Sequence, residues 1–93
     1  MPREALAKWG WYTQHVHYVY ILRLSDGSYY IGFSTDLKQR IESHAWGEAE
    51  STKNFLPVKL VFYAAFSTQQ LATKFEKYLK SSSGFAFRNK RLV

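Results

Sequence analysis

The stretch "VHYVYILRLSDGSYYIGF", residues 16–33, decides the fold of this chain. Its first half, residues 16–24, is rich in β-branched and aromatic side chains, a composition typical of strands. The central "SDGS" at 25–28 contains Asp-Gly, a pair that tolerates the positive φ angles of a tight hairpin turn. "YYIGF" at 29–33 is then the returning strand. The segment therefore predicts a β-hairpin.

A helix is predicted directly after the hairpin, at residues 37–46. The preceding "STD" offers side chains that suit an N-cap. Apolar residues recur within the segment at helical spacing: Leu37, Ile41 and Ala45.

The second half of the chain predicts a third strand and a further helix. A loop that contains Gly, Ser, Asn and Pro, residues 47–57, leads into "VKLVFYAAF" at 58–66, which is a strand sequence. "STQQ" has the capping-box pattern, Ser with Gln three residues on, and begins a helix at 68–80. The apolar stripe of that helix is expected to be Leu71, Phe75, Tyr78 and Leu79. A short basic tail helix is predicted at 85–92.

The order of predicted elements is β-β-α-β-α-α. It favours an α+β sandwich, with a three-stranded antiparallel sheet flanked by helices. The chain of 93 residues is long enough for one domain with one modest core, which we assign to residues 16–92. Residues 1–15 are too short to form a stable helix alone and are treated as an N-terminal appendage.

Composition narrows the classes of function. The chain has no cysteine, which excludes a disulfide scaffold and a thiolate metal site and is compatible with a cytoplasmic location. No apolar run approaches the roughly 20 residues that span a membrane. The formal net charge of +6 favours a polyanionic partner such as nucleic acid, although a basic surface also serves solubility.

Several short motifs occur in a specific order: "YVY" at 18–20, "YIG" at 30–32, then Arg40, His44 and Glu76. Together they resemble the plan of the GIY-YIG nuclease superfamily. The length, the "DLKQRIESH" segment and the "KYLKSSSGFAFRNKRL" ending are similar to its small single-domain bacterial branch, like the N-terminal domain of an excision-repair endonuclease. The first motif departs from the family pattern, because Tyr-Val-Tyr replaces Gly-Ile-Tyr, but its last tyrosine is retained.

The resemblance implies metal-dependent hydrolysis of DNA phosphodiester bonds. Tyr30 would act as general base and Tyr20 would position the water or phosphate, although the two roles could be exchanged. Arg40 would hold a non-bridging phosphate oxygen through its planar fork. His44, one helical turn further on, would bond a tyrosine hydroxyl or the phosphate. Glu76 would hold one Mg²⁺, or Mn²⁺ in its place, since a single carboxylate with waters suits such a hydrated ion.

Substrate contacts are expected from basic and amide side chains. The family often places an asparagine near the end of the domain, where it contacts phosphate. The candidates in this chain are Asn89, Lys53, Lys80, Arg88, Lys90 and Arg91. The tryptophans, Trp46 among them, are expected to pack rather than to stack on bases.

Other interpretations stay open at this point. Glu76 could be a surface residue paired with Lys80 at i+4. The whole domain could be a non-catalytic nucleic-acid-binding module, or a protein-interaction module with only the fold in common. We expect 93 residues to leave no room for a separate DNA-targeting domain, so that specificity would come from DNA structure, the loop at 47–57, residues 1–15 or a partner protein.

Overall fold

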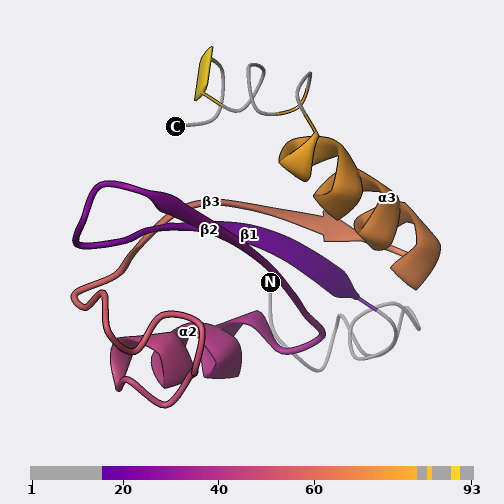
Figure 1. Cartoon of the computed structure of the whole chain (residues 1–93). Helices are drawn as coiled ribbons and strands as arrows, with labels where there is room; N and C mark the ends of the chain where they lie inside the picture. Colours follow the sequence, from indigo (N-terminus) through magenta and orange to yellow (C-terminus); the bar gives the residue numbers. More distant parts are fainter. Residues whose placement is uncertain (1–15, 82–83, 85–88, 91–93) are drawn as a thin grey trace.

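A computed structural model describes residues 16–81 together with residues 84, 89 and 90 (Figure 1). The elements are β1 (His17–Arg23), β2 (Tyr29–Ser34), α2 (Leu37–Ala45), β3 (Lys59–Phe66) and α3 (Gln69–Lys80). Their order confirms the predicted α+β class, and their ends lie close to the predicted ones. The appendage lies outside the described residues, as does most of the predicted tail helix. No helix in the described part is long and apolar enough to cross a membrane.

The sheet has the strand order β2-β1-β3, and β1 is antiparallel to both neighbours. Tyr20 lies opposite Gly32 on β2 and opposite Tyr63 on β3, whereas Leu22 lies opposite Tyr30. Side chains two residues apart on a strand share a face. The register therefore places Tyr20, Tyr30 and Tyr63 on one face of the sheet, which the sequence could not show.

The local signals in the hairpin and at the helix starts act largely as expected. Gly27 has a φ of 86°, and the Asp26 carboxylate accepts hydrogen bonds from the backbone N–H and the hydroxyl of Ser28. Asp36 caps α2 by accepting from the backbone N–H of residue 39. At α3, however, the N-cap is Thr68 rather than the serine before it, and its hydroxyl accepts from the N–H of residue 71.

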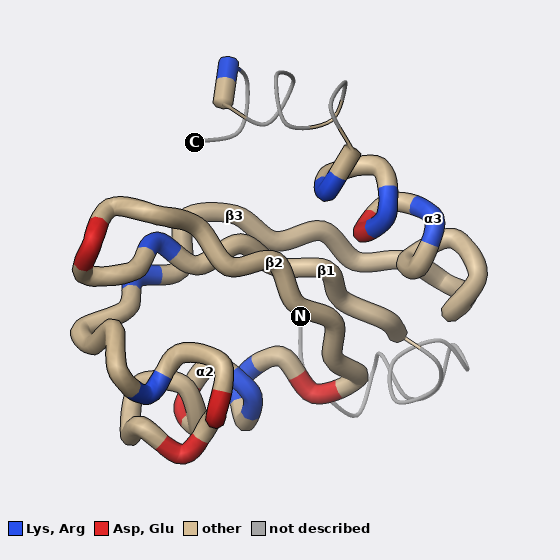
Figure 2. The backbone as a smooth tube through the Cα atoms, in the orientation of Figure 1, with Lys and Arg blue, Asp and Glu red and all other residues tan. Residues whose placement is uncertain are grey.

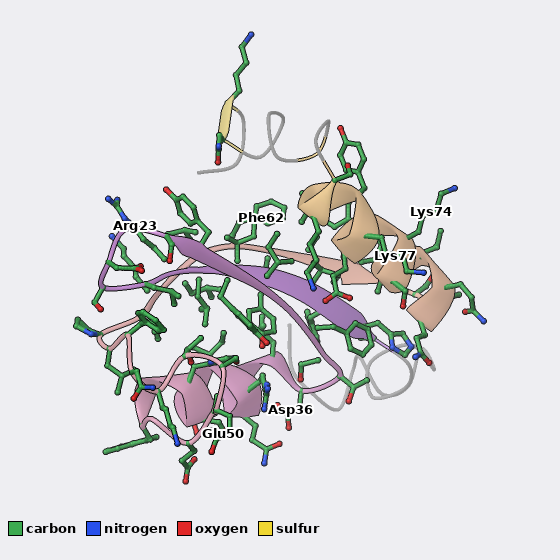
Figure 3. All side chains as sticks on the ribbon, in the orientation of Figure 1. Arg23, Asp36, Glu50, Phe62, Lys74 and Lys77 are labelled. Carbon is green, nitrogen blue, oxygen red and sulfur yellow. The ribbon has the colours of Figure 1, made fainter. Side chains whose placement is uncertain are left out.

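The two helices lie on opposite sides of the sheet (Figure 1). Helix α3 packs on one face, where Ala72 and Leu79 join Val19, Ile21 and Ile31 in the buried core. Phe62 lies on this same side, with its ring 6.3 Å from that of Phe75 on α3 (Figure 3). Tyr29 also packs against this core, as we expected. The other face, with Tyr20 and Tyr30, is turned toward α2.

The inward stripe of α3 is rotated from the predicted one. Leu71 and Tyr78 are 49% and 41% exposed, whereas Ala72 and Leu79 are fully buried. The inward positions are therefore 72, 75, 76 and 79, the i, i+3, i+4, i+7 pattern of one helix face. Because the side chain of Ala72 is small, the helix can pack close to the sheet at this position. This rotation turns the carboxylate of Glu76 toward the body of the protein.

The predictions for the C-terminal end of α2 were wrong in two places. Ala45 is exposed, because the inward face of α2 consists of positions 37, 40, 41 and 44 instead. Trp46, which we expected to pack, is 79% exposed. It is the C-cap of the helix, where the chain turns away from the sheet into a positive-φ residue, Gly47.

Candidate functional site

The position of Tyr20 depends on the glycine of the "YIG" segment. Tyr20 has no exposed surface, and its ring lies across Gly32. A Cβ atom at position 32 would overlap the ring carbon Cζ and the hydroxyl oxygen of Tyr20. The absent side chain therefore lets the ring and hydroxyl of Tyr20 lie over the edge strand β2.

Behind Tyr20 lies a short chain of buried polar groups. The Tyr20 hydroxyl is 2.8 Å from Nε2 of His44, and Nδ1 of His44 is 2.6 Å from the hydroxyl of Thr52. His44 and Thr52 also have no exposed surface. Burial lowers the pKa of His44, and the nearby charge of Arg40 lowers it further, so the ring is neutral.

Tyr30 completes an aromatic cluster around His44. Its ring centroid lies 5.2 Å from that of His44 and 6.3 Å from that of Tyr20. Unlike Tyr20, Tyr30 retains partial exposure. The strand therefore alternates as we expected: Tyr29 packs on the core side, and Tyr30 lies on the face that carries the site.

Arg40 joins the two tyrosines. Its guanidinium lies beside the hydroxyls of Tyr20 and Tyr30, and the interaction with Tyr20 is the main reason that the pKa of Arg40 is raised. Burial raises the pKa of Tyr20, although the hydrogen bond from Arg40 acts in the opposite direction. Tyr20 is thus a protonated hydroxyl at neutral pH that lies beside a cation.

Glu76 lies on α3, which packs on the opposite face of the sheet, and it acts on the same cluster through its charge. Its negative charge is one of the influences that raise the pKa of Tyr20. The side chain of Glu76 is 22% exposed, and its carboxylate forms an ion pair with Nζ of Lys80 at 3.2 Å. The i+4 pairing with Lys80 is therefore present, but Glu76 is not an ordinary exposed surface residue.

The candidate substrate contacts are dispersed. The ammonium group of Lys53, which is exposed, donates to the carboxylate of Glu50 at 3.1 Å. The ammonium group of Lys80 forms an ion pair with the carboxylate of Glu76. Asn89 and Lys90 are exposed, whereas Arg88 and Arg91 lie outside the described residues. Basic positions recur along α3 (Figure 2), and the structure does not gather the six candidates into one patch among the residues that it describes.

Two functional candidates escaped the sequence analysis. Thr52 lies in a loop and has no local pattern that would mark it as the partner of His44. Tyr63 is 54% exposed on the same sheet face as Tyr20, and its ring is 6.3 Å from that of Tyr18 in an edge arrangement. The adjacent aromatics Phe62 and Tyr63 are the signal that could have indicated Tyr63, because successive residues of a strand point to opposite faces and only one of the two can join the core on the α3 side.

Comparisons with known proteins identify the family of this chain. The GIY-YIG catalytic domain family matches residues 16–91. A UPF0213 protein of Streptococcus pneumoniae serotype 4 is 42% identical over 67 residues, which cover 71% of this chain and 68% of that protein. The UPF0213 protein BH0048 of Halalkalibacterium halodurans is 43% identical over 68 residues, with 72% of each chain covered.

A solved structure shows the same fold. The solution NMR structure of the UPF0213 protein BH0048 from Bacillus halodurans superimposes with a TM-score of 0.53 at 37% sequence identity, and covers 81% of this chain and 83% of its own. The family match spans most of the chain, including both tyrosine motifs and the helices that carry Arg40 and Glu76. This chain therefore belongs to the GIY-YIG catalytic domain family.

Proposed function

We propose that this protein is a metal-dependent endonuclease that hydrolyses DNA phosphodiester bonds. The observation that carries the proposal is the cluster of Tyr20, Tyr30 and His44, beside which the guanidinium of Arg40 interacts with both tyrosine hydroxyls. A fixed guanidinium beside two phenols, with a buried histidine behind them, suits phosphate binding and proton transfer better than it suits core packing. Family membership supports a nuclease-type fold for the same residues.

The two tyrosines differ in solvent exposure, and we use this difference to assign their roles. Tyr30 is partly exposed and can meet a water molecule, whereas Tyr20 is enclosed. We therefore assign the general-base role to Tyr30, which would take a proton from the attacking water. Tyr20 holds the guanidinium of Arg40 in position. Arg40 is then directed at the non-bridging phosphate oxygens, where negative charge grows in the transition state.

Glu76 is the residue that would hold the metal. Within the described residues, no three His, Cys, Asp or Glu side chains gather into a site that could hold a metal ion. A lone, partly exposed carboxylate still fits Mg²⁺, which keeps several waters and takes phosphate oxygens as ligands; Mn²⁺ would substitute. The bound ion would supply Lewis-acid stabilisation of the leaving oxygen. Lys80 must release the carboxylate before the ion binds.

DNA would meet several groups around this centre. We propose phosphate contacts from Lys53, Lys80, Asn89 and Lys90, and from Arg88 and Arg91. The exposed ring of Tyr63 offers a surface on which a base can stack. A cytoplasmic role in DNA repair, and a partner protein that confers specificity, belong to this proposal and rest on the family resemblance.

The test is cleavage of supercoiled plasmid, branched DNA and single-stranded DNA with Mg²⁺ or Mn²⁺. We expect Tyr30→Phe, Arg40→Ala and Glu76→Ala to abolish cleavage while the proteins stay folded. Tyr29→Phe is the matched control, because Tyr29 is the neighbouring residue and packs on the opposite face. Absence of cleavage by the wild-type protein, or equal cleavage by the Tyr30 and Tyr29 variants, would rule out the enzyme.

A non-catalytic nucleic-acid-binding module is the second candidate. The ion pair between Glu76 and Lys80 favours it, because a binding module has no need of a free carboxylate. Such a module would bind DNA without cutting it. With about four phosphate contacts, the logarithm of its binding constant would fall with the logarithm of salt concentration at a slope near −3.6. A protein-interaction module would show almost no such slope.

A further inference from the structure

The buried chain from Tyr20 through His44 to Thr52 has a direction that the donor chemistry determines. Arg40 places a positive charge beside the hydroxyl of Tyr20, which favours the oxygen lone pairs, and not the proton, on the side of the guanidinium. The single hydroxyl proton of Tyr20 is then left for Nε2 of His44, which lies at 2.8 Å. A neutral imidazole that accepts at Nε2 carries its proton on Nδ1.

Among the described residues, one hydrogen-bond acceptor is available to the proton on Nδ1 of His44. Nδ1 of His44 is 2.6 Å from the hydroxyl oxygen of Thr52, which accepts it. The opposite direction would turn the Tyr20 proton away from His44, near the positive charge of Arg40, and would leave that proton without the acceptor that it now has. An unpaired polar group costs most where no water reaches it, as in this fully buried chain.

We infer that Thr52 is a positioning residue for the active site. By accepting from Nδ1, it fixes His44 in the tautomer that accepts from Tyr20. Tyr20 then turns its lone pairs toward Arg40 and holds the guanidinium. The inference rests on the proposed function, in which Arg40 binds the phosphate. It also gives a role to the loop at 47–57, whose buried Ala49 and turn bond from Thr52 N–H to Ala49 C=O anchor Thr52.

The groups that face His44 come from each element packed around it. They are Tyr20 on β1, Tyr30 on β2 and Thr52 in the loop, with Arg40 one turn earlier on α2. Glu76 on α3 acts on Tyr20 by charge. The only cation in this set is Arg40, which further opposes a second proton on the ring.

The first test needs no variant and no DNA. Two-bond ¹H–¹⁵N correlation spectra of the full-length protein near neutral pH distinguish a protonated ring nitrogen from an unprotonated one. We expect His44 to carry its proton on Nδ1 and to have an unprotonated Nε2. A proton on Nε2, or on both nitrogens, overturns the inference, whether or not the protein cuts DNA.

The second test compares Thr52→Val with Thr52→Ser. Valine has nearly the shape of threonine but no hydroxyl, whereas serine retains the acceptor. For Thr52→Val we expect a changed tautomer signal and a kcat at least about ten-fold lower, the size expected for a buried polar group left unpaired. KM should change little, and Thr52→Ser should behave like the wild type.

The outcomes separate this inference from the proposed function. If both Thr52 variants keep the wild-type tautomer and rate, Thr52 is not a positioning residue, although the protein can still be a nuclease. If the wild-type protein never cuts DNA while His44 shows the expected tautomer, the hydrogen-bond chain stands and the proposed function fails. If the Thr52→Val variant does not fold, the spectrum of the wild-type protein still tests the inference, because it shows which ring nitrogen of His44 carries the proton.

Discussion

Gly32 and Tyr20 face each other across β1 and β2, and the tyrosine ring fills the space in which a side chain at position 32 would lie. The glycine is therefore a steric requirement of the site rather than a turn residue. A buried, hydrogen-bonded ring has little room to move aside, because His44 holds its hydroxyl.

Gly32→Ala is accordingly expected to destabilise the protein and displace Tyr20. Overpacking of this kind typically costs about 1–3 kcal/mol. Urea unfolding measures this cost, and the cleavage assay measures the displacement. In a Tyr20→Leu background the same substitution should cost clearly less, because the overlapping ring is gone. An equal cost in both backgrounds would show that the ring is not what excludes a side chain at 32.

The neutral, buried His44 should make stability depend on pH. Burial lowers the pKa of the ring in the folded protein, whereas in the unfolded chain it takes up a proton below about pH 6.5. Between these two pKa values the unfolded state binds more protons, so stability falls as the pH is lowered below about 6.5. From this group alone the slope is at most about 1.4 kcal/mol per pH unit.

Urea midpoints measured from about pH 7.5 down to about pH 5 test this dependence. His44→Gln lacks the ionisation and should flatten the curve within that range. If wild type and His44→Gln lose stability in parallel, the dependence comes from other groups.

Arg40→Lys should be nearly as inactive as Arg40→Ala. Lysine keeps the charge but lacks the planar fork that lies beside Tyr20 and Tyr30 and would bind two phosphate oxygens. Loss of a transition-state donor of this kind typically lowers kcat by about 100-fold or more. Lys38→Ala, on the exposed side of the same helix, is the control and should retain activity. A fully active Arg40→Lys would mean that only the charge matters.

Lys80→Gln should bind divalent metal more tightly than the wild type. The substitution removes the cation that now occupies the carboxylate of Glu76 at 3.2 Å. Because exposed ion pairs contribute at most about 1 kcal/mol, we expect a gain of no more than about five-fold. Isothermal titration with Mn²⁺ measures it. Lys74→Gln, on the outer side of α3 (Figure 3), is the control; equal gains in both variants would reflect net charge alone.

Tyr63→Ser should weaken DNA binding, whereas Tyr63→Phe should not. Tyr63 is 54% exposed on the face of the sheet that carries Tyr20. Stacking of a base on an aromatic ring is worth about 1–3 kcal/mol, which corresponds to a loss of roughly ten-fold or more in affinity. Fluorescence anisotropy with a labelled single strand measures this loss. Equal affinity of the two variants would show that the ring does not touch the DNA.

Local chemistry explains why so much of the fold was predictable from the sequence. Asp-Gly at 26–27 specifies the hairpin turn, Asp36 specifies the start of α2, and β-branched and aromatic runs specify the strands. Each of these signals acts over a few residues, so none depends on the rest of the chain. The inward stripe of α3 was misplaced because apolar residues occupy too wide an arc of that helix for its sequence to select one face.

The candidate site was predictable only as a set of residues in order. The motifs named Tyr20, Tyr30, Arg40, His44 and Glu76 as candidates, but neither the face of either tyrosine nor the burial of Tyr20 follows from spacing. The strand register determines which face of the sheet each tyrosine occupies, because a shift of one residue moves every side chain to the other face. The packing of Tyr20 over Gly32 determines that Tyr20 is buried.

By itself, the sequence determined the elements, the hairpin and the family, because turns, caps and periodicity are properties of neighbouring residues. Only the tertiary structure decided that Thr52 hydrogen-bonds to His44, that Trp46 is exposed and that Arg40 lies beside both tyrosines. Each of these facts joins segments distant in sequence, and depends on which groups compete for the same buried space and the same hydrogen bonds.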